Sequence, residues 1–321
     1  MTRAAIGVDI GGTNVKLGLV SQKGEVLLHD LFLTNDHSGR KELLKQLAAR
    51  IEILKKEAKF RKLTLAGVGI GAPGPVDVER GFVYFFPNIP GWRNTPLKKI
   101  LQDKTRLPIF VDNDANVMAW AEYCFGAGRG SQNMIALTLG TGLGGGIVMN
   151  GKLFHGRHYS AAEMGHMVID PNGPLCGCGN RGCVETFVGN GYFVKDVREH
   201  LQAGGHSILN EWVTKEGREL TPQLVQEAAR LGDKLSQGQW KKTGEYLGTA
   251  LAGLVNVLNP ERIVLGGGMA RAGAPIFAPV RAAIKKKAFP IAARFVKVLP
   301  AELGYDAGLI GAAALVFSSK P

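Results

Sequence analysis

The chain has 321 residues, and its hydrophobic content of 45% is enough for two domains with cores of their own. Its formal net charge is +12, because 39 lysines and arginines outnumber 27 aspartates and glutamates. A positive field favours anionic ligands such as nucleotides, polyphosphate or nucleic acid, but short basic clusters are usually solvated helix faces. The sequence starts without a basic and apolar leader and has no apolar run of membrane length. Because its cysteines are few and most of them have metal-ligand spacing, we expect a protein of the reducing cytoplasm.

The first half of the chain alternates between strand and helix patterns. Buried apolar runs predict strands at 4–10, 15–20, 26–33, 65–70, 82–86 and 109–111. Apolar residues at a period of 3.6 predict a helix over 40–60, and Pro96 marks the start of another that ends at Thr105. Asp112, Asn113 and Asp114 predict the cap of a helix that runs to Phe125.

The second half repeats the opening loosely, as a strand, a glycine turn and a strand. We expect these strands at 134–139 and 145–149, with Asn150-Gly151 as a hairpin turn. Further strands are predicted at 263–265 and 295–298, and helices at 191–202, 207–214, 222–231, 236–258, 275–288 and 307–317. The repetition hints at a duplicated unit.

Three of the four cysteines lie in one short stretch with a C-x-C-x4-C spacing. Cys176, Cys178 and Cys183 together with His166 supply the ligands of a closed tetrahedral zinc shell. Gly177, Gly179 and Gly182 are expected to let the backbone turn tightly around the ion. Reduced or disulfide-bonded cysteines are the alternative, but the spacing is typical of metal ligands. A closed shell leaves no position for catalytic water, so the predicted zinc is structural. Two carboxylates flank this loop and are candidates for holding a polar ligand: Glu163 and Glu185.

Three glycine turns share one chemistry. They contain Gly11-Gly12-Thr13, Thr141-Gly142 and Gly267, and each follows a predicted strand. Consecutive backbone N–H groups in such turns cradle phosphate oxygens, and the threonine hydroxyls add donors. The spacings of the P-loop and of the dinucleotide-binding fingerprint are absent. Three turns in two halves of the chain fit a nucleotide between two domains, and Asp9 at a strand end is placed to hold magnesium or to cap its turn.

These residues together resemble the ROK family of sugar kinases and repressors, and within it the bacterial glucokinases. The resemblance rests on Asp9–Thr13 with Lys16, on Asn113-Asp114, on Glu163-x-Gly-His166 and on the cysteine loop ending in Glu185, and it spans the chain. It implies an α/β, actin-like or hexokinase-type (ribonuclease H-like) fold with two lobes and an interdomain cleft. We place the small lobe at 1–115 plus 305–321 and the large, zinc-binding lobe at 116–304.

The family resemblance also implies an ATP- and magnesium-dependent glucokinase of glycolysis that phosphorylates the 6-hydroxyl of glucose. Asp114 would be the catalytic base. Asn113, Glu163, His166 and Glu185 would hold the sugar hydroxyls, with Gly74 and Asn88 lining the sugar, and His166 would also bind zinc. ATP would be held by Asp9, Gly11, Gly12, Thr13, Lys16, Thr141, Gly142 and Gly267. The family often forms dimers or tetramers, so a homo-oligomer is expected.

The sequence departs from the family at one position and leaves several alternatives open. Relatives usually have glycine where this chain has Ala162, which adds a methyl group beside the pocket. N-acetylglucosamine, N-acetylmannosamine, mannose or fructose are alternative substrates, and polyphosphate is an alternative donor. A non-catalytic sugar sensor is the other class, although eight residues before Asp9 leave no room for a repressor's helix-turn-helix domain. Binding to nucleic acid is suggested by charge alone, and the aromatic and basic stripes it requires are absent.

Overall fold

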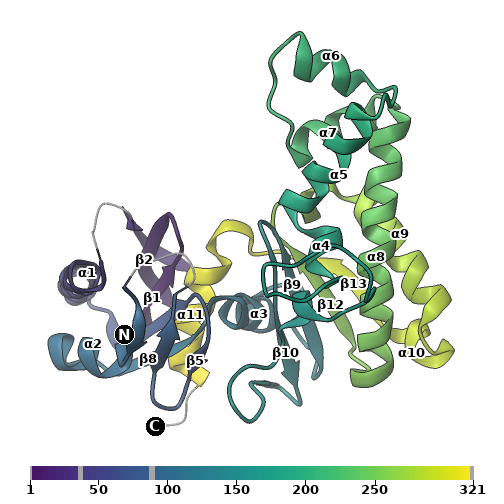
Figure 1. Ribbon diagram of the computed structural model, residues 1–321. Coiled ribbons are helices and arrows are strands. Elements are labelled where there is room, and N and C mark those ends of the chain that lie inside the picture. Colours follow the sequence, from purple (N-terminus) through teal and green to yellow (C-terminus); the bar gives the residue numbers. More distant parts are fainter. Residues whose placement is uncertain (1, 35–38, 87–90, 319–321) are drawn as a thin grey trace. The chain divides into compact units, whose positions relative to one another are not determined.

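A computed structural model describes residues 2–34, 39–86 and 91–318 of the chain, and it divides into two compact units (Figure 1). Unit 1 comprises residues 1–132, 146–162 and 301–321, and unit 2 comprises 133–145 and 163–300. Both are built from strands and helices, as an α/β fold requires. No helix in the described ranges is long and apolar enough to cross a membrane.

Unit 1 is built on a five-stranded sheet with the order β3-β2-β1-β4-β8. The first three strands pair antiparallel, and β4 and β8 then continue parallel to β1. The chain thus begins with two hairpins and adds its later strands through helical crossovers. The strands and helices of this region are β1 Arg3–Ile10, β2 Asn14–Ser21, β3 Val26–Leu33, α1 Arg40–Phe60, β4 Thr64–Ala72, β5 Val76–Asp77, β6 Phe82–Phe85, β7 Arg93–Thr95, α2 Leu97–Thr105, β8 Ile109–Asn113, α3 Asp114–Phe125, β11 Lys152–Leu153, the 3-10 helix η4 Gly304–Asp306 and α11 Ala307–Ser318.

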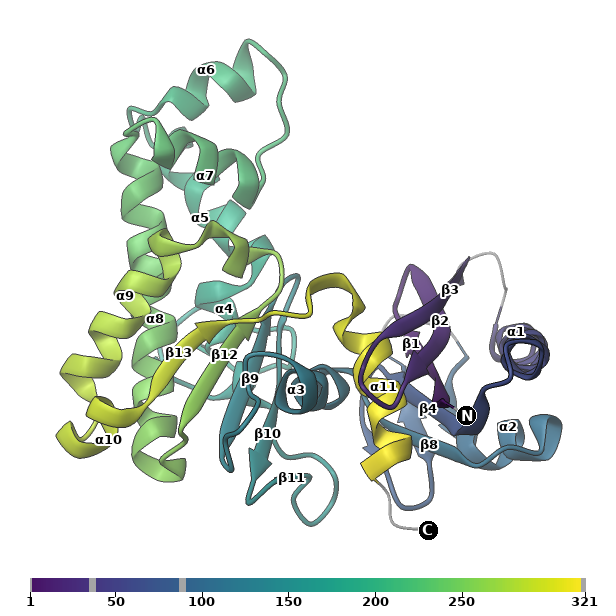
Figure 2. The same ribbon diagram turned by 180° about the vertical axis from the view of Figure 1, so that it is seen from behind.

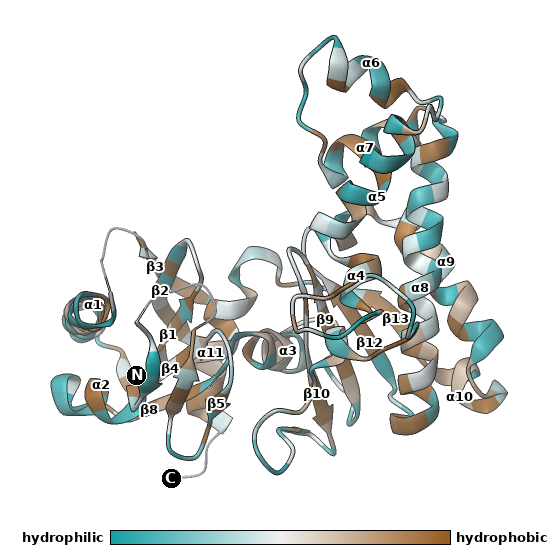
Figure 3. Cartoon of the chain, in the orientation of Figure 1, coloured by the Kyte–Doolittle hydropathy of each residue, from teal (hydrophilic) through white to brown (hydrophobic). Residues whose placement is uncertain are grey.

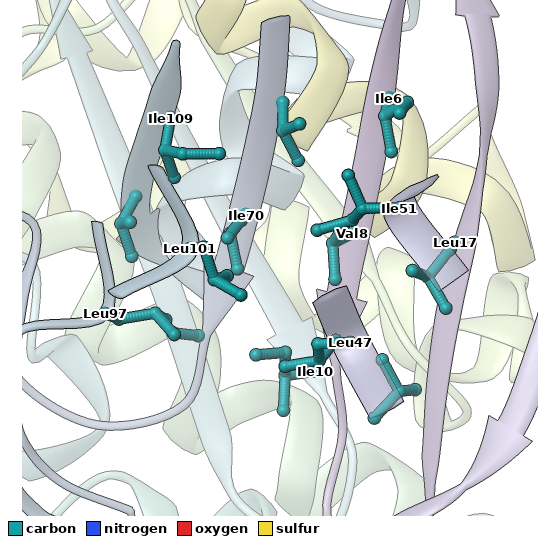
Figure 4. Close-up of a cluster of buried hydrophobic side chains, with 14 of the residues drawn as sticks. Ile6, Val8, Ile10, Leu17, Leu47, Ile51, Ile70, Leu97, Leu101 and Ile109 are labelled. Carbon is teal, nitrogen blue, oxygen red and sulfur yellow. The ribbon is translucent and has the colours of Figure 1, made fainter. Parts of the chain in front are cut away.

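The sheet of unit 1 has a hydrophobic core on each face. On one face, residues of β1, β4 and β8 pack against α1 and α2, as Ile6, Ile51 and Leu101 illustrate in Figure 4. On the other face, α11 packs against α3 and the strands through small residues. Gly69 of β4 permits this packing, because a Cβ there would overlap the carbonyl oxygen of Ala312. Glycine therefore lets the backbone of α11 lie directly on the sheet.

Unit 2 contains a parallel sheet core covered by long helices. Strand β12 pairs in parallel with β9 and with β13, within a sheet of order β11-β10-β9-β12-β13 (Figure 2). Helices α8 and α9 lie side by side, and α8 shows mixed polar and apolar faces whereas the strands are largely apolar (Figure 3). The elements of this region are β9 Met134–Leu139, β10 Leu143–Met149, η2 Met164–His166, α4 Glu185–Val188, α5 Asn190–Gln202, α6 Ile208–Thr214, α7 Pro222–Arg230, α8 Lys234–Leu258, β12 Arg262–Gly266, η3 Met269–Ala272, α9 Ala274–Lys287, α10 Pro290–Phe295 and β13 Lys297–Pro300.

The two sheets share one strand order, which supports the duplicated unit inferred from the sequence. In each, the third strand of the order is the first in the chain, the next two strands of that sheet lie on one side of it, and two strands in parallel pairing lie on the other side. This order and the alternation of strands with helices are those of the actin-like fold that the sequence predicted.

Most predicted elements are present, and the predicted position of the last strand is wrong. The helix over 40–60 and the strand over 134–139 have the predicted bounds, and Asn113 caps α3. The strand predicted at 295–298 is instead Lys297–Pro300, because Pro290 begins a short helix that ends at Phe295. The glycine turn at Gly267 leads into the 3-10 helix η3 rather than into an α-helix, which begins at Ala274.

Candidate active site and metal loop

Several predicted site residues of unit 1 meet at one edge of its sheet. Asp9 near the end of β1 pairs with Gly71 of β4, and Ala72 pairs with Asn113 at the end of β8. Since the three strands are parallel, their carboxyl ends lie at the same edge. Asp114 follows as the first residue of α3, and Gly74 lies just beyond β4. In open α/β sheets, this is the edge at which ligands bind.

The side chain of Asn113 is fixed because it both accepts and donates hydrogen bonds. Its side-chain oxygen accepts from the backbone N–H groups of Ala115 (2.9 Å) and Asn116 (3.2 Å), which caps α3. Its amide nitrogen donates to the carbonyl oxygen of Gly74 (3.1 Å). Asp114 accepts from Ala115 N–H (2.8 Å). The pair predicted to bind and deprotonate a sugar hydroxyl is therefore attached to both β8 and the loop after β4.

Asp9 lies half-buried beside a lysine. Lys16 Nζ is 3.6 Å from Asp9 Oδ2, donates to the carbonyl of Tyr305 (3.1 Å) and lies 3.6 Å from the centroid of that residue's ring. Burial raises the pKa of Asp9, and the Lys16 ammonium opposes that shift. A second cation at Asp9, such as magnesium, would favour its charged form.

The turn between β1 and β2 is closed by backbone hydrogen bonds. Gly11 N–H donates to Asn14 O (2.9 Å), Thr34 N–H donates to Thr13 O (2.8 Å), and the Thr34 hydroxyl donates to Gly11 O (2.8 Å). A Cβ at Gly11 would lie 2.9 Å from Asn14 O, so glycine is required by the close approach. Thr13 is exposed and Gly12 half-buried, which leaves this turn accessible to a ligand.

Unit 2 brings its two predicted phosphate turns together. Gly266 of β12 pairs with Thr138 of β9, so the turns that follow these parallel strands share an edge. Gly267 has a φ of +86°, and a Cβ on it would overlap the backbone of Leu139. Thr141 is exposed and Gly142 half-buried in the other turn. The two turns are far apart in the sequence, and the sheet makes them neighbours.

The four predicted metal ligands converge within unit 2. One ligand atom from each of His166, Cys176, Cys178 and Cys183 lies within 4.8 Å of all the others. The Sγ atoms of Cys178 and Cys183 are 3.7 Å apart, and His166 Nδ1 is 3.6 Å from Cys176 Sγ. A tetrahedral ion with Zn–S about 2.3 Å and Zn–N about 2.0 Å requires sulfurs about 3.8 Å apart and a sulfur-to-nitrogen distance of about 3.5 Å. The donor set and its spacing therefore fit zinc.

The thiols differ in their intrinsic acidity. Burial raises the pKa of Cys183 to about 12, whereas the backbone N–H of Asn180 is the main cause that lowers the pKa of Cys178. A cation coordinated by both sulfurs would stabilise both thiolates, which is how zinc binding becomes coupled to proton release.

Two of the three loop glycines are required by the backbone. Gly179 and Gly182 have φ values of +94° and +66°, and a Cβ at Gly182 would overlap the carbonyl oxygen of Asp170. Gly177 has an ordinary φ, and a Cβ added to it would have no atom within 4 Å. The expectation that Gly177 also enables the turn is therefore not supported.

Glu185 connects the cysteine loop, residues 176–183, to the turn at Thr141-Gly142. It begins α4, its Oε1 is 3.8 Å from Cys176 Sγ, and its Oε2 accepts from Leu143 N–H (2.9 Å). A Cβ at Gly142 would lie 2.6 Å from Glu185 Oε2, so glycine there permits this contact. Glu163 is exposed, and its carbonyl accepts from His166 N–H (3.0 Å) at the start of η2. The chain thus holds Glu163, His166 and Glu185 in one locally bonded region of unit 2.

Two further findings concern one predicted residue and one ion pair that was not predicted. Asn88, predicted to line the sugar, lies outside the described residues. Sequence reasoning missed an ion pair behind Asn113, in which His155 Nε2 lies 2.7 Å from Asp112 Oδ2. The two residues are 43 positions apart, and no periodicity or spacing in the sequence relates them.

The whole chain matches one protein family. The ROK family model covers residues 5–319, and the chain belongs to the ROK family. It is 37% identical over 313 residues to a glucokinase of Thermotoga maritima, an alignment that covers 97% of this chain and 96% of that relative.

Solved structures of the family show the same fold. One is a ROK family glucokinase from Streptomyces griseus in complex with glucose and AMPPNP, with a TM-score of 0.80 and 35% identity, covering 98% of this chain and 100% of that one. Another is a ROK family transcriptional regulator, a homologue of the E. coli MLC protein, with a TM-score of 0.89 and 29% identity, covering 99% of this chain and 78% of that one. The family therefore includes both kinases and regulators.

Proposed function

We propose that this protein transfers the γ-phosphoryl group of ATP to the 6-hydroxyl of a hexose, with glucose as the preferred substrate. The observation that carries the proposal is the meeting of Asp9 and Asn113-Asp114 at one edge of the unit 1 sheet. One carboxylate there is suited to a metal–nucleotide and the other to a sugar hydroxyl. The glucokinase relatives support a sugar kinase as the class.

Asp114 acts as the general base in this proposal. Phosphoryl transfer depends mainly on positioning and on neutralising charge, so the protein needs only one proton acceptor near the attacking hydroxyl. Asp114 is held at the first turn of α3 and receives the proton of the 6-hydroxyl as the oxygen attacks phosphorus. A base of this kind contributes about 10²–10⁴-fold to the rate.

The remaining sugar contacts are proposed from the family resemblance, residue by residue. Asn113 is oriented by its bond to Gly74, and its role is to bind a sugar hydroxyl beside Asp114. Glu163 and Glu185 accept from sugar hydroxyls, and His166 uses the ring nitrogen that does not face the cysteines. Asn88 is proposed for the same site from the family resemblance.

Two metals have separate tasks. Zinc, held by His166, Cys176, Cys178 and Cys183, would fix the loop that leads into Glu185, and a closed shell gives it no chemical step. Magnesium would be held near Asp9 and neutralise charge on the phosphates, as it does in other phosphoryl transfers. The turns at Gly11-Gly12-Thr13, Thr141-Gly142 and Gly267, together with Lys16, supply the donors for the nucleotide.

The test is ADP formation from ATP with a panel of sugars. The panel contains glucose, mannose, fructose, N-acetylglucosamine and N-acetylmannosamine, and a parallel series replaces ATP by polyphosphate. We expect the highest kcat/KM with glucose and ATP. If turnover with an N-acetylhexosamine is far above turnover with glucose, the assignment of glucose as the preferred substrate would be wrong, but the protein would still be a sugar kinase.

A sugar-sensing regulator is the second candidate, because the chain is as similar in fold to a transcriptional regulator as to the kinases. A sensor would bind hexose but release no ADP. Hexose binding by calorimetry without turnover on any sugar would therefore favour the regulator over the kinase.

A further inference from the structure

Behind the candidate catalytic pair lies a buried carboxylate whose two oxygens are both used. Asp112 is 3% exposed and directly precedes Asn113 in β8. Its Oδ1 accepts from the backbone N–H of Asn113 (2.7 Å) and from the side-chain amide of Asn116 (3.0 Å). Its Oδ2 lies 2.7 Å from His155 Nε2. Because an ionised carboxylate only accepts, the ring must carry a proton on Nε2.

His155 belongs to a loop that leads to another part of the proposed site. The loop begins after β11, where Phe154 N–H donates to Ile147 O (2.8 Å), and closes on itself through Ala161 N–H donating to His155 O (3.1 Å). The chain then continues through Ala162 to Glu163. The side chain of His155 thus bonds this loop to β8, the strand that ends at Asn113.

Asp112 and His155 face a cavity whose lining does not include Asn113 or Asp114. Asp112 and His155 line a cavity of about 680 Å³ together with Lys98, Trp120 and Lys152. Asn113 directs its own side chain to Gly74 and to the first turn of α3. In the proposed function neither Asp112 nor His155 touches substrate, but Asp112 accepts a hydrogen bond from Asn113, which would bind the sugar, and His155 holds Asp112.

We propose that Asp112 and His155 are positioning residues of the phosphotransfer site. The pair fixes the backbone of Asn113 and, through Asn116, the first turn of α3, and it bonds β8 to the loop that contains His155. This inference rests on the proposed kinase function. A buried carboxylate that loses one partner shifts to regain hydrogen bonds, and a displacement of about 1 Å at a reacting group lowers the rate by about 10²-fold.

The experiment compares three variants of the full-length protein. His155→Leu removes the donor, and His155→Gln restores an N–H at the place of Nε2. His158→Leu changes an exposed histidine of the same loop and serves as the matched control. Steady-state kinetics would be measured with glucose and ATP varied separately, alongside the melting temperature and the glucose affinity from calorimetry.

We expect His155→Leu to lower kcat about 10–100-fold and to raise the KM for glucose several-fold, with the KM for ATP changed less than about twofold. His155→Gln should recover kcat to within about threefold of wild type, and His158→Leu should match wild type. Equal loss in Gln and Leu variants, a Leu variant with wild-type kcat, or an equal rise in both KM values would overturn the proposal. If His155→Leu does not fold, Asp112→Asn is compared with wild type: a lower kcat with a raised KM for glucose would support the proposal, and a wild-type kcat would overturn it.

Failure of the proposed kinase function gives a different result. Wild-type protein would then release no ADP with any sugar, and the positioning role would be judged by glucose affinity alone. A weaker affinity in His155→Leu that His155→Gln restores would still support it, and an unchanged affinity would refute it.

Discussion

Substituting one glycine of the cysteine loop, residues 176–183, gives a sharp test of how that loop is held. At Gly182 the backbone has a φ of +66°, and a Cβ would overlap the carbonyl oxygen of Asp170. At Gly177, five residues earlier, φ is ordinary and nothing lies within 4 Å of an added Cβ. Gly182→Ala and Gly177→Ala therefore add the same methyl group to one loop in two different environments.

The expected cost of Gly182→Ala follows from its conformation. A left-handed conformation costs a residue with a Cβ about 1–2 kcal/mol, and the overlap with Asp170 adds to that. For a protein unit of this size, 1 kcal/mol lowers the melting temperature by about 2–4 °C, so the decrease should be at least about 2–8 °C. Gly182 N–H also donates to Pro174 O (2.8 Å), so a shift at residue 182 moves the neighbouring cysteines.

The assay is thermal unfolding combined with bound zinc per chain. We expect Gly182→Ala to have a lower melting temperature and less bound zinc per chain than the wild type. Gly177→Ala should have wild-type values of both. Gly182→Ala with wild-type zinc content and stability would refute the reasoning, as would a Gly177→Ala variant that is equally impaired.

Three other perturbations test separate parts of the account. Removing zinc with a chelator should lower both the melting temperature and the glucose affinity, since Glu185 follows the loop; no change in either would remove the metal from its role. Ala162→Gly should raise the free energy of unfolding by about 0.5–1 kcal/mol, because Ala162 has a φ of +69° and glycine adopts that value freely; a loss of stability in denaturant titration would contradict this. Burial lowers the pKa of His155, but the hydrogen bond and charge of Asp112 raise it more, so the folded-state pKa is above the ordinary 6.5. The stabilisation by protonated His155 is then complete below pH 6.5 and is lost as the pH rises through the folded-state pKa. His155→Gln should therefore lower the melting temperature more at pH 5.5 than at pH 9. An equal decrease at both pH values would contradict a stabilising positive charge on His155.

Local chemistry in the sequence is sufficient to predict most of the elements and the cluster of one histidine and three cysteines. The apolar period of 3.6 gives both ends of α1, and the asparagine side chain that caps α3 is evident from its position after a strand. The cysteine spacing indicates the cluster because its ligands are close in the chain. In the structure, their four ligand atoms lie within 4.8 Å of one another.

Contacts between distant segments cannot be inferred in this way. His155 and Asp112 meet only because β11 and its loop return to the end of β8. The glycines at 177 and 182 look alike in sequence, and only the position of Asp170 makes one of them necessary. The short helix at 290–295 has too few residues to show a helical period, and its one local signal is Pro290, since proline is favoured at the first turn of a helix.

The most direct test of the central claim is the rate of ADP formation with ATP and glucose in wild type and in Asp114→Asn. We expect glucose-dependent turnover in the wild type with glucose 6-phosphate as product. We also expect a decrease of about 10²–10⁴-fold in kcat in the variant, with glucose affinity and melting temperature retained. Near wild-type kcat in Asp114→Asn would contradict the assignment of Asp114 as the base.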